Sequence, residues 1–334
     1  MPARSRLALA AAPAGACLLA ALGISGAASA PPVEPAAPPN TIAGTTCEAF
    51  PADNYWHADI STLPVHARSA SWLSLMSTTR DLHPDFGPSY GDGPNYGLPI
   101  TVVPGSHPKV SVRFGYADES DHVRYPLGRD TRIEGGRASD GDRHAILVDK
   151  ATCRLYETFD THVRNGRWRA GSGATWSLTS NALRPDTWTS ADAAGLPILP
   201  GLLRWSEVRD GYVDHAIRFT TDVTSRHYVW PARHQAGSQD SLNYPPMGAR
   251  FRLRASYSPD GLGPHARTVV AAMKTYGLVL ADNGSPWFFQ GERSPLWPEQ
   301  LVEDLKTIPA SEFEAVDASG LMDSPDSARV RPGS

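Results

Sequence analysis

Apolar residues recur at helical spacing in three segments of the chain, residues 64–77, 264–276 and 298–306. Spacings of three and four positions are typical of amphipathic helices. Each segment also begins on a proline, which suits the first turn of a helix because its missing N–H has no helical partner there. Gly277 follows the second segment, where glycine commonly ends a helix. The pattern therefore predicts three helices.

Most of the remaining chain has the pattern of short strands and turns. Residues 144–149 (HAILVD) and 153–159 (CRLYETF) flank a three-residue connection, which predicts a β-hairpin. Because short strands outnumber helices, we expect an all-β leaning fold, a β-sandwich or jelly-roll-like single domain decorated with about three α-helices. Alternating strand and helix units are not evident, which disfavours a doubly wound sheet or a TIM barrel. Further strands are expected over residues 109–116, 168–178, 215–221, 228–231, 249–257 and 278–281.

The first thirty residues have the three parts of an export signal. Arg4 and Arg6 precede an apolar stretch over residues 7–24, and Ala28-Ser29-Ala30 matches a cleavage site. An uncleaved membrane anchor is the alternative, but the apolar run is short. We expect a signal peptide over residues 1–30 and secretion of the mature chain. The rest is expected to form a Pro-rich tether (31–45), one β-rich globular domain (46–317) and a flexible tail (318–334).

Composition and cysteine content narrow the class of protein. Hydrophobic residues make up 41% of the 334 positions, which provides for a sizeable core, and the net charge is −4 without a basic run. This excludes the electrostatic signature of a nucleic-acid binder. Signal cleavage leaves Cys47 and Cys153, which predict one disulfide in an oxidising compartment. Neither cysteine lies in a C-x-x-C pair, so we expect no metal site and no cofactor.

Common enzyme motifs are missing from the sequence. It has no G-x-S-x-G elbow, no H-E-x-x-H pair and no Walker-type phosphate loop. An α/β-hydrolase site and a zinc protease are therefore disfavoured. Asp140-Gly141-Asp142 resembles part of a calcium loop, but the other acidic ligands of an EF-hand are missing, so we expect an ordinary turn there.

A polar and aromatic cluster in the second half of the chain suggests carbohydrate chemistry. Charged or amide side chains recur within a few residues of aromatic rings, and sugars stack on such rings while their hydroxyls bind polar groups. The candidate catalytic residues are Asp192, Asp282 and His215. The candidate substrate-binding residues are Asn181, Trp188, Arg218, Trp230, His234, Asn283 and Arg252.

Each candidate also has a structural interpretation. Asp192 and the sequence Asp282-Asn283-Gly284 can simply form turns, and the tryptophans can belong to the core. His215 shares a strand face with Ile217 and Phe219, which favours a buried, hydrogen-bonded imidazole.

Arg250, Arg252 and Arg254 share one face of a predicted strand. That face is either solvated, or concave and able to present guanidinium groups to an acidic polysaccharide.

Five segments resemble a group of secreted proteins from actinobacteria and other soil bacteria. The resemblance covers most of residues 47–317 and implies an exported, β-rich single domain, with no established activity. The segments are RAGSGATWSL, WTSADAAGLPILPGLLRWSEVRDGYVDHAIRFT, YVWPARH, PPMGARFRLRAS and KTYGLVLADNGSPWF.

Two classes of function follow from the candidates. The first is a secreted polysaccharide-degrading glycosidase, in which Asp192 and Asp282 form the carboxylate pair of an aromatic groove. A variant is a uronate-polysaccharide lyase, in which His215 or a tyrosine abstracts the proton. The second class is a glycan-binding or cell-surface protein without catalysis. In every case the expected partner is a polysaccharide or cell-surface glycan, with no nucleic acid and no membrane after signal cleavage.

Overall fold

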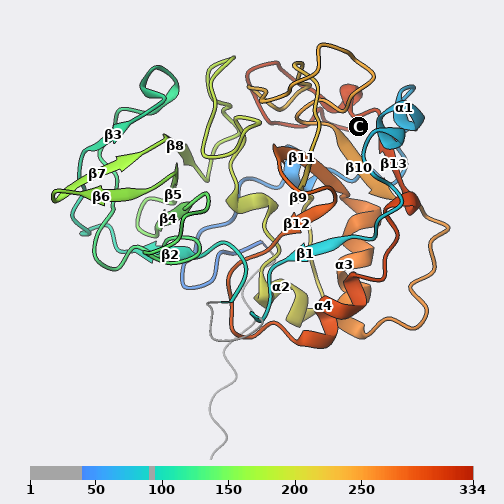
Figure 1. Ribbon diagram of the computed structural model, residues 1–334, viewed down its shortest axis with the longest axis horizontal. Coiled ribbons are helices and arrows are strands. Elements are labelled where there is room, and N and C mark those ends of the chain that lie inside the picture. Colours follow the sequence, from blue (N-terminus) through green and yellow to red (C-terminus); the bar gives the residue numbers. More distant parts are fainter. Residues whose placement is uncertain (1–39, 90–94, 334) are drawn as a thin grey trace, which may run out of the picture. The chain divides into compact units, whose positions relative to one another are not determined.

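The hairpin expected around residues 150–152 is confirmed and belongs to a four-stranded sheet. In the computed structural model, β4 (Ala145–Asp149) and β5 (Arg154–Phe159) pair antiparallel in register, from Ala145 opposite Thr158 to Asp149 opposite Arg154. Strand β2 (Ile100–Val103) joins β4 in parallel, and β8 (Ser172–Ser177) joins β5 antiparallel. The sheet has the order β2-β4-β5-β8 (Figure 1).

The structure describes residues 40–89 and 95–333. The expected signal peptide (1–30) and residues 31–39 of the expected tether lie outside them. No helix within the described ranges is long and apolar enough to cross a membrane.

A small three-stranded sheet contains β3 (Val112–Phe114), β7 (Arg167–Ala170) and β6 (His162–Arg164), in the order β3-β7-β6. The single strand expected over residues 168–178 is therefore wrong, since it is divided between β7 and β8 at Gly171. A Cβ atom on Gly171 would lie 2.7 Å from the Phe159 ring, so the chain turns there at a position that only glycine fits.

The third sheet has six strands and carries most of the candidate site. Its order is β1-β12-β9-β11-β10-β13 (Figure 1), in which β1 with β12 and β9 with β11 pair in parallel and the other neighbours pair antiparallel. The bounds are β1 (His83–Asp85), β9 (Ile217–Thr221), β10 (Arg250–Leu253), β11 (Leu278–Asn283), β12 (Phe288–Gln290) and β13 (Phe313–Val316).

A bulge in β11 decides which face of this sheet Asp282 occupies. Leu280 pairs with Phe219 of β9, but the next paired residue is Asp282, opposite Thr220, so one residue is skipped. In a regular strand Asp282 would share the core-facing side of Leu280, because side chains alternate with period two. The skipped residue instead places Asp282 on the same face as Arg218.

Two of the three expected helices are confirmed nearly to the residue. Helix α3 (Pro264–Thr275) begins on its proline, and α4 (Glu299–Leu305) begins just after Pro298. The helix expected over residues 64–77 is much shorter, α1 (Ser69–Ser74), and α2 (Trp205–Asp210) was not expected, because six residues are too few to establish a period. Short 3-10 helices lie at η1 (Tyr55–His57), η2 (Ala117–Glu119), η3 (Leu199–Gly201), η4 (Ala310–Glu312) and η5 (Ser319–Leu321).

The strand-rich character of the fold is confirmed, and its sandwich or jelly-roll packing stays a prediction. The largest apolar cluster combines the six-stranded sheet with α3 and α4, and includes Phe219, Phe251 and Trp287, all fully buried. A separate cluster lies on the four-stranded sheet around Ile146 and Leu155.

Both ends of the described chain pack against the domain, which corrects two expected boundaries. Asn40 and Ile42, inside the expected tether, are buried. Residues 318–333 do not fray, since Leu321 and Ala328 are buried and the Ala328 N–H donates to the carbonyl of Asn181. The predicted disulfide is confirmed between Cys47 and Cys153, where it ties the N-terminal segment to β5.

Candidate functional site

Arg218, at the second position of β9, is the centre of the site. Its guanidinium is buried and donates from Nε and Nη2 to the two carboxylate oxygens of Asp192, over 3.1 and 2.9 Å. Asp192 comes from the loop before η3, and only 1% of its surface is exposed. A bidentate pair of this kind is strong and geometrically fixed. With both oxygens taken by Arg218, Asp192 is placed to hold the arginine, and the expectation that it reacts with substrate does not fit this geometry.

Asp282 approaches the same guanidinium from β11. One of its carboxylate oxygens lies 3.5 Å from Arg218 Nη2, and about a quarter of its side chain is exposed. Burial and the negative charge of Asp192 raise the pKa of Asp282 to about 7. A carboxyl with such a pKa still carries its proton in about half of the molecules at neutral pH and can donate it.

His144 and Glu134 form a second charged pair beside Arg218. The imidazole Nδ1 lies 2.6 Å from Glu134 Oε2, and Nε2 lies 3.0 Å from the Ala191 carbonyl. Because both partners are acceptors, both ring nitrogens donate, which describes an imidazolium. Burial acts to lower the pKa of His144, but the charge and hydrogen bond of Glu134 outweigh it and raise that pKa to about 9.

Glu134 is kept ionised by the same contact. Burial acts to raise its pKa, whereas the charge of His144 and hydrogen bonds from its ring and backbone N–H lower it, and the net direction is down. Both hydrogen bonds reach Oε2. Within the described part of the chain, Oε1 accepts no hydrogen bond, and 28% of the side chain is exposed.

These groups line one cavity of about 260 Å³, which we call the acidic cavity. The two larger sheets and their flanking loops both contribute to it. Gln290 lies opposite Asp85 in the β1–β12 pair, is 5% exposed, and its Oε1 has no hydrogen-bond partner within residues 40–89 and 95–333. The lining residues are Asp85, Leu98, Glu134, Asp142, His144, Arg218, Thr220, Asp282, Asn283, Gly284, Ser285, Phe288 and Gln290.

Asp282 also lines a neighbouring cavity of similar volume. That cavity is bordered by Asp192 and His234 together with Tyr116 and Phe159. The His234 Nδ1 atom lies 2.9 Å from the Ala193 carbonyl, which fixes the ring. The carboxyl of Asp282 therefore lies between the two cavities and is accessible from both of them.

Five candidates lie at the two cavities and others lie elsewhere. Arg218, Asp282 and Asn283 line the acidic cavity, and Asp192 and His234 line the neighbouring one together with Asp282. His215 is buried in a different network, with Nε2 at 3.2 Å from Glu207 and Nδ1 at 2.8 Å from the Ala216 carbonyl. It lines neither cavity, as its apolar strand face suggested.

The remaining polar candidates have structural partners. Asn181 donates to Asp53 and accepts from Asn54. Arg252 donates to Glu314 and to three backbone carbonyls over residues 60–63. The guanidinium of Arg252 is therefore occupied by the protein, whereas Arg254 on the same face is partly exposed and Arg250 lines a separate cavity of about 370 Å³.

The expected aromatic groove does not form from the two candidate tryptophans. Trp188 lies under the guanidinium of Arg184, at 5.5 Å, and Trp230 packs edge-on against Tyr55 at 4.9 Å while its indole N–H donates to Ser327. Neither indole lines the two cavities around Asp282. Phe288 is the aromatic residue on the wall of the acidic cavity.

Asp85, Glu134, Asp142, His144 and Gln290 were not expected in the site. Asp142 and His144 lie directly before a buried strand. Two ionisable residues next to an apolar run could have been recognised in the sequence as candidate site residues. Glu134 and Asp85 occupy loops and a short strand without any periodic pattern. Among the described residues, no group of three or more His, Cys, Asp or Glu is arranged to hold a metal ion.

In comparisons with known proteins, no family model matches the sequence, and neither a curated protein nor a solved structure matches the chain. The chemistry of the site is therefore derived from its residues alone.

Proposed function

We propose that this protein is an exported glycosidase that hydrolyses a polysaccharide in the acidic cavity. The observation that carries the proposal is that the pKa values of two carboxyls in one cavity are shifted in opposite directions, that of Asp282 upward to about 7 and that of Glu134 downward. Glycoside hydrolysis needs one carboxyl of each kind. The disulfide between Cys47 and Cys153 supports export.

Asp282 is the proposed proton donor to the glycosidic oxygen. After the proton leaves, its carboxylate faces Arg218 Nη2 at 3.5 Å, so the charge that develops has a fixed cation beside it. Asp192 acts as a positioning residue, because its two hydrogen bonds hold the guanidinium in place.

Glu134 is the proposed nucleophile, or the base that activates water. His144 occupies Oε2 and leaves Oε1 as the oxygen available to the sugar or the water. His144 is cationic and has no lone pair to spare, so it serves to hold Glu134 and keep it ionised. Phe288 and the amide of Gln290 complete the wall against which a sugar ring would lie.

The test is a panel of neutral and uronic polysaccharides, incubated with the mature chain. Reducing-end release and absorbance near 235 nm are read in the same samples. Hydrolysis gives reducing ends without absorbance. We expect D282N and E134Q to lower the rate by about 10²–10⁴-fold. The matched control is D240N, because Asp240 is 77% exposed at its side chain and lines neither cavity around Asp282.

Two alternatives are outcomes of the same panel. New absorbance at 235 nm would identify a lyase, for which Arg218 and Gln290 could neutralise a uronate carboxylate in the cavity. A lyase also needs an unprotonated base, and the cationic His144 does not supply one. Retention on an insoluble glycan without any cleavage would identify a glycan-binding protein. Either result overturns the glycosidase proposal.

A further inference from the structure

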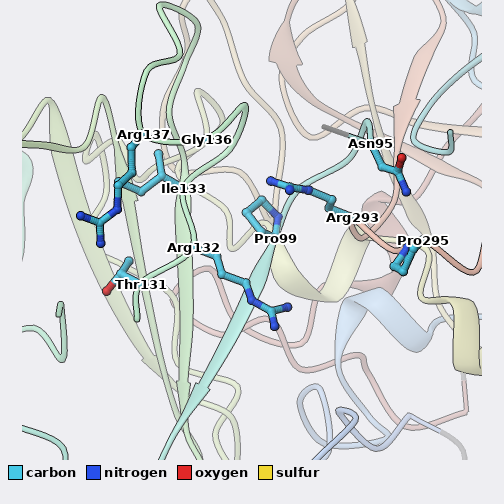
Figure 2. Close-up of a pocket in the computed structure, with 9 residues that line it drawn as sticks. All are labelled: Asn95, Pro99, Thr131, Arg132, Ile133, Gly136, Arg137, Arg293 and Pro295. Carbon is cyan, nitrogen blue, oxygen red and sulfur yellow. The ribbon is translucent and has the colours of Figure 1, made fainter. Parts of the chain in front are cut away.

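Three arginines line a cavity of about 510 Å³ beside the acidic cavity (Figure 2). They are Arg132, Arg137 and Arg293, and we call their site the arginine pocket. Figure 2 shows Arg132 and Arg293 reaching from opposite sides past Pro99. The other lining residues are Asn95, Pro99, Thr131, Ile133, Gly136 and Pro295, and no carboxylate is among the nine.

Two of the three guanidinium groups of this pocket have no partner in the part of the chain that the structure describes. Within the described ranges, the side chains of Arg132 and Arg293 make no hydrogen bond or ion pair, and Arg137 donates only from Nη2, to the Arg129 carbonyl. Several buried arginines of the chain are engaged instead. Arg184, for example, binds Asp121 and two backbone carbonyls. The pocket therefore offers two guanidinium groups whose donors have no acceptor among the described residues.

A second observation lies next to it. Arg132 also lines a cavity of about 440 Å³ in which Arg204 is 1% exposed. Nε and Nη1 of Arg204 are buried and have no hydrogen-bond partner within residues 40–89 and 95–333. Buried donors are seldom left without an acceptor, because the lost hydration is costly. The carboxylates of Glu292 and Asp130 line this second cavity as well and would repel an anion. We therefore assign the anion site to the arginine pocket, and Arg204 lies in the cavity next to it.

The arginine pocket and the acidic cavity use neighbouring residues of the same three segments. Pro99 lines the first and Leu98 the second, and the same holds for Ile133 and Glu134. In the third segment the relation is looser, since Arg293 lies three residues after Gln290, the last residue of β12. Adjacent Cα atoms are about 3.8 Å apart, so a short saccharide chain can reach from one site to the other.

We propose that the arginine pocket binds a carboxylate or sulfate group on a saccharide chain whose neighbouring sugar occupies the acidic cavity. Guanidinium groups match both anions through paired hydrogen bonds. The apolar edges of Pro99, Ile133 and Pro295 suit the carbon face of a sugar ring. The inference rests on the proposed function, and it names the substrate class as an anionic polysaccharide with its charge one or more units from the cleaved bond.

Equilibrium binding to the full mature chain tests this with two matched pairs of probes. A galacturonate hexamer is compared with its methyl ester, and a sulfated dextran oligosaccharide with uncharged dextran of equal length. We expect one charged member to bind at least tenfold more tightly than its uncharged partner, and added salt to weaken that binding. Preference in the first pair assigns a carboxylate, and preference in the second pair a sulfate.

The variants R132Q and R293Q are each expected to weaken binding of the charged probe about tenfold. Neither arginine side chain has a partner to lose among the described residues, so both variants should fold, which circular dichroism checks. R167Q is the matched control, because Arg167 is an exposed arginine of β7 outside these cavities. Equal binding of charged and uncharged probes, no binding of either charged probe, or unchanged binding by R132Q and R293Q would each overturn the inference.

Reducing-end release in the same samples separates this inference from the proposed function. Arginine-dependent binding of a charged probe without cleavage of any panel substrate would keep the anion site and overturn the glycosidase. Cleavage of a neutral polysaccharide that R132Q and R293Q do not affect, with no preference for charged probes, would keep the glycosidase and overturn the anion site.

Discussion

Glu134 Oε2 accepts hydrogen bonds from both Nδ1 and the backbone N–H of His144, at 2.6 and 3.2 Å. One carboxylate oxygen thus fixes the position, orientation and charge of a buried imidazole. The same contact keeps Glu134 ionised while its other oxygen takes no protein hydrogen bond within the described residues. The contact between Glu134 and His144 therefore affects both the stability of the fold and the proposed reactivity of Glu134, and each effect can be measured.

The stability of the protein should fall as pH rises from about 6.5 to 9. The pKa of His144 is raised to about 9 in the folded chain, against 6.5 unfolded, so its contribution is fully present below pH 6.5 and is lost as pH rises through 9. The loss attributable to His144 is on the order of 3 kcal/mol. Urea unfolding at a series of pH values measures it. H144Q should flatten this part of the profile, whereas H227Q, at an exposed histidine, should not. An identical slope in H144Q would refute the assignment.

Removing Asp192 should destabilise the fold strongly. D192A leaves the buried guanidinium of Arg218 with Asp282 alone, at 3.5 Å, and an incompletely paired buried charge costs about 3–5 kcal/mol. Denaturant unfolding of D192A measures the change in the free energy of unfolding. D186A is the control, because Asp186 is 63% exposed at its side chain, and its effect should stay within about 1 kcal/mol. A D192A chain as stable as the wild type would show that the pair is not intact in solution.

On any substrate that is cleaved, kcat/KM should fall as pH rises through about 7. The reason is that Asp282 must carry its proton, and its pKa is raised to about 7. The acidic limb should belong to Glu134, which must be ionised. Initial rates across pH 4–9 give both limbs. An unchanged basic limb in D282N would assign the proton donor to another group.

Loss of the disulfide should lower the free energy of unfolding by about 4–5 kcal/mol, since Cys47 and Cys153 are 106 residues apart and close a long loop. The double variant C47S/C153S, or wild type in reductant, measures this against oxidised wild type. The variant should show no further effect of reductant. A wild-type midpoint that reductant leaves unchanged would show that the bond is not formed.

Features of the fold that depend on a short segment of chain could be predicted from local sequence patterns. The 144–159 hairpin, α3 and the disulfide follow from alternation, a proline and glycine at the helix ends, and the number of cysteines. Arg218, Asp282 and Asn283 were expected as separate candidates, from polar residues close to aromatic ones in the sequence, and their meeting in one cavity was not predicted. The hairpin and helix signals each lie within about a dozen residues of chain, and the disulfide follows from the number of cysteines left after signal cleavage.

Pairings between distant segments could not be predicted in this way. β9 and β11 are parallel neighbours although β10 and α3 separate them along the chain, and no spacing in either strand indicates it. Glu134 and His144 meet through a loop without periodicity, so their sequence separation carried no information. Asp192 was taken for a reacting group because its partner Arg218 comes from another segment, and only the fold brings the two together.

The bulge in β11 makes the proposed chemistry depend on how this strand pairs as well as on residue type. If Ala281 paired with Thr220 in a regular ladder, Asp282 would lie opposite Thr221 and its carboxyl would turn toward the apolar core beside Phe219. Deleting Ala281 would instead remove the bulge and leave Asp282 opposite Thr220, on the face of Arg218. For recognising this site in other chains, an acid directly after the position of Leu280 is therefore equivalent to an acid that follows a one-residue bulge.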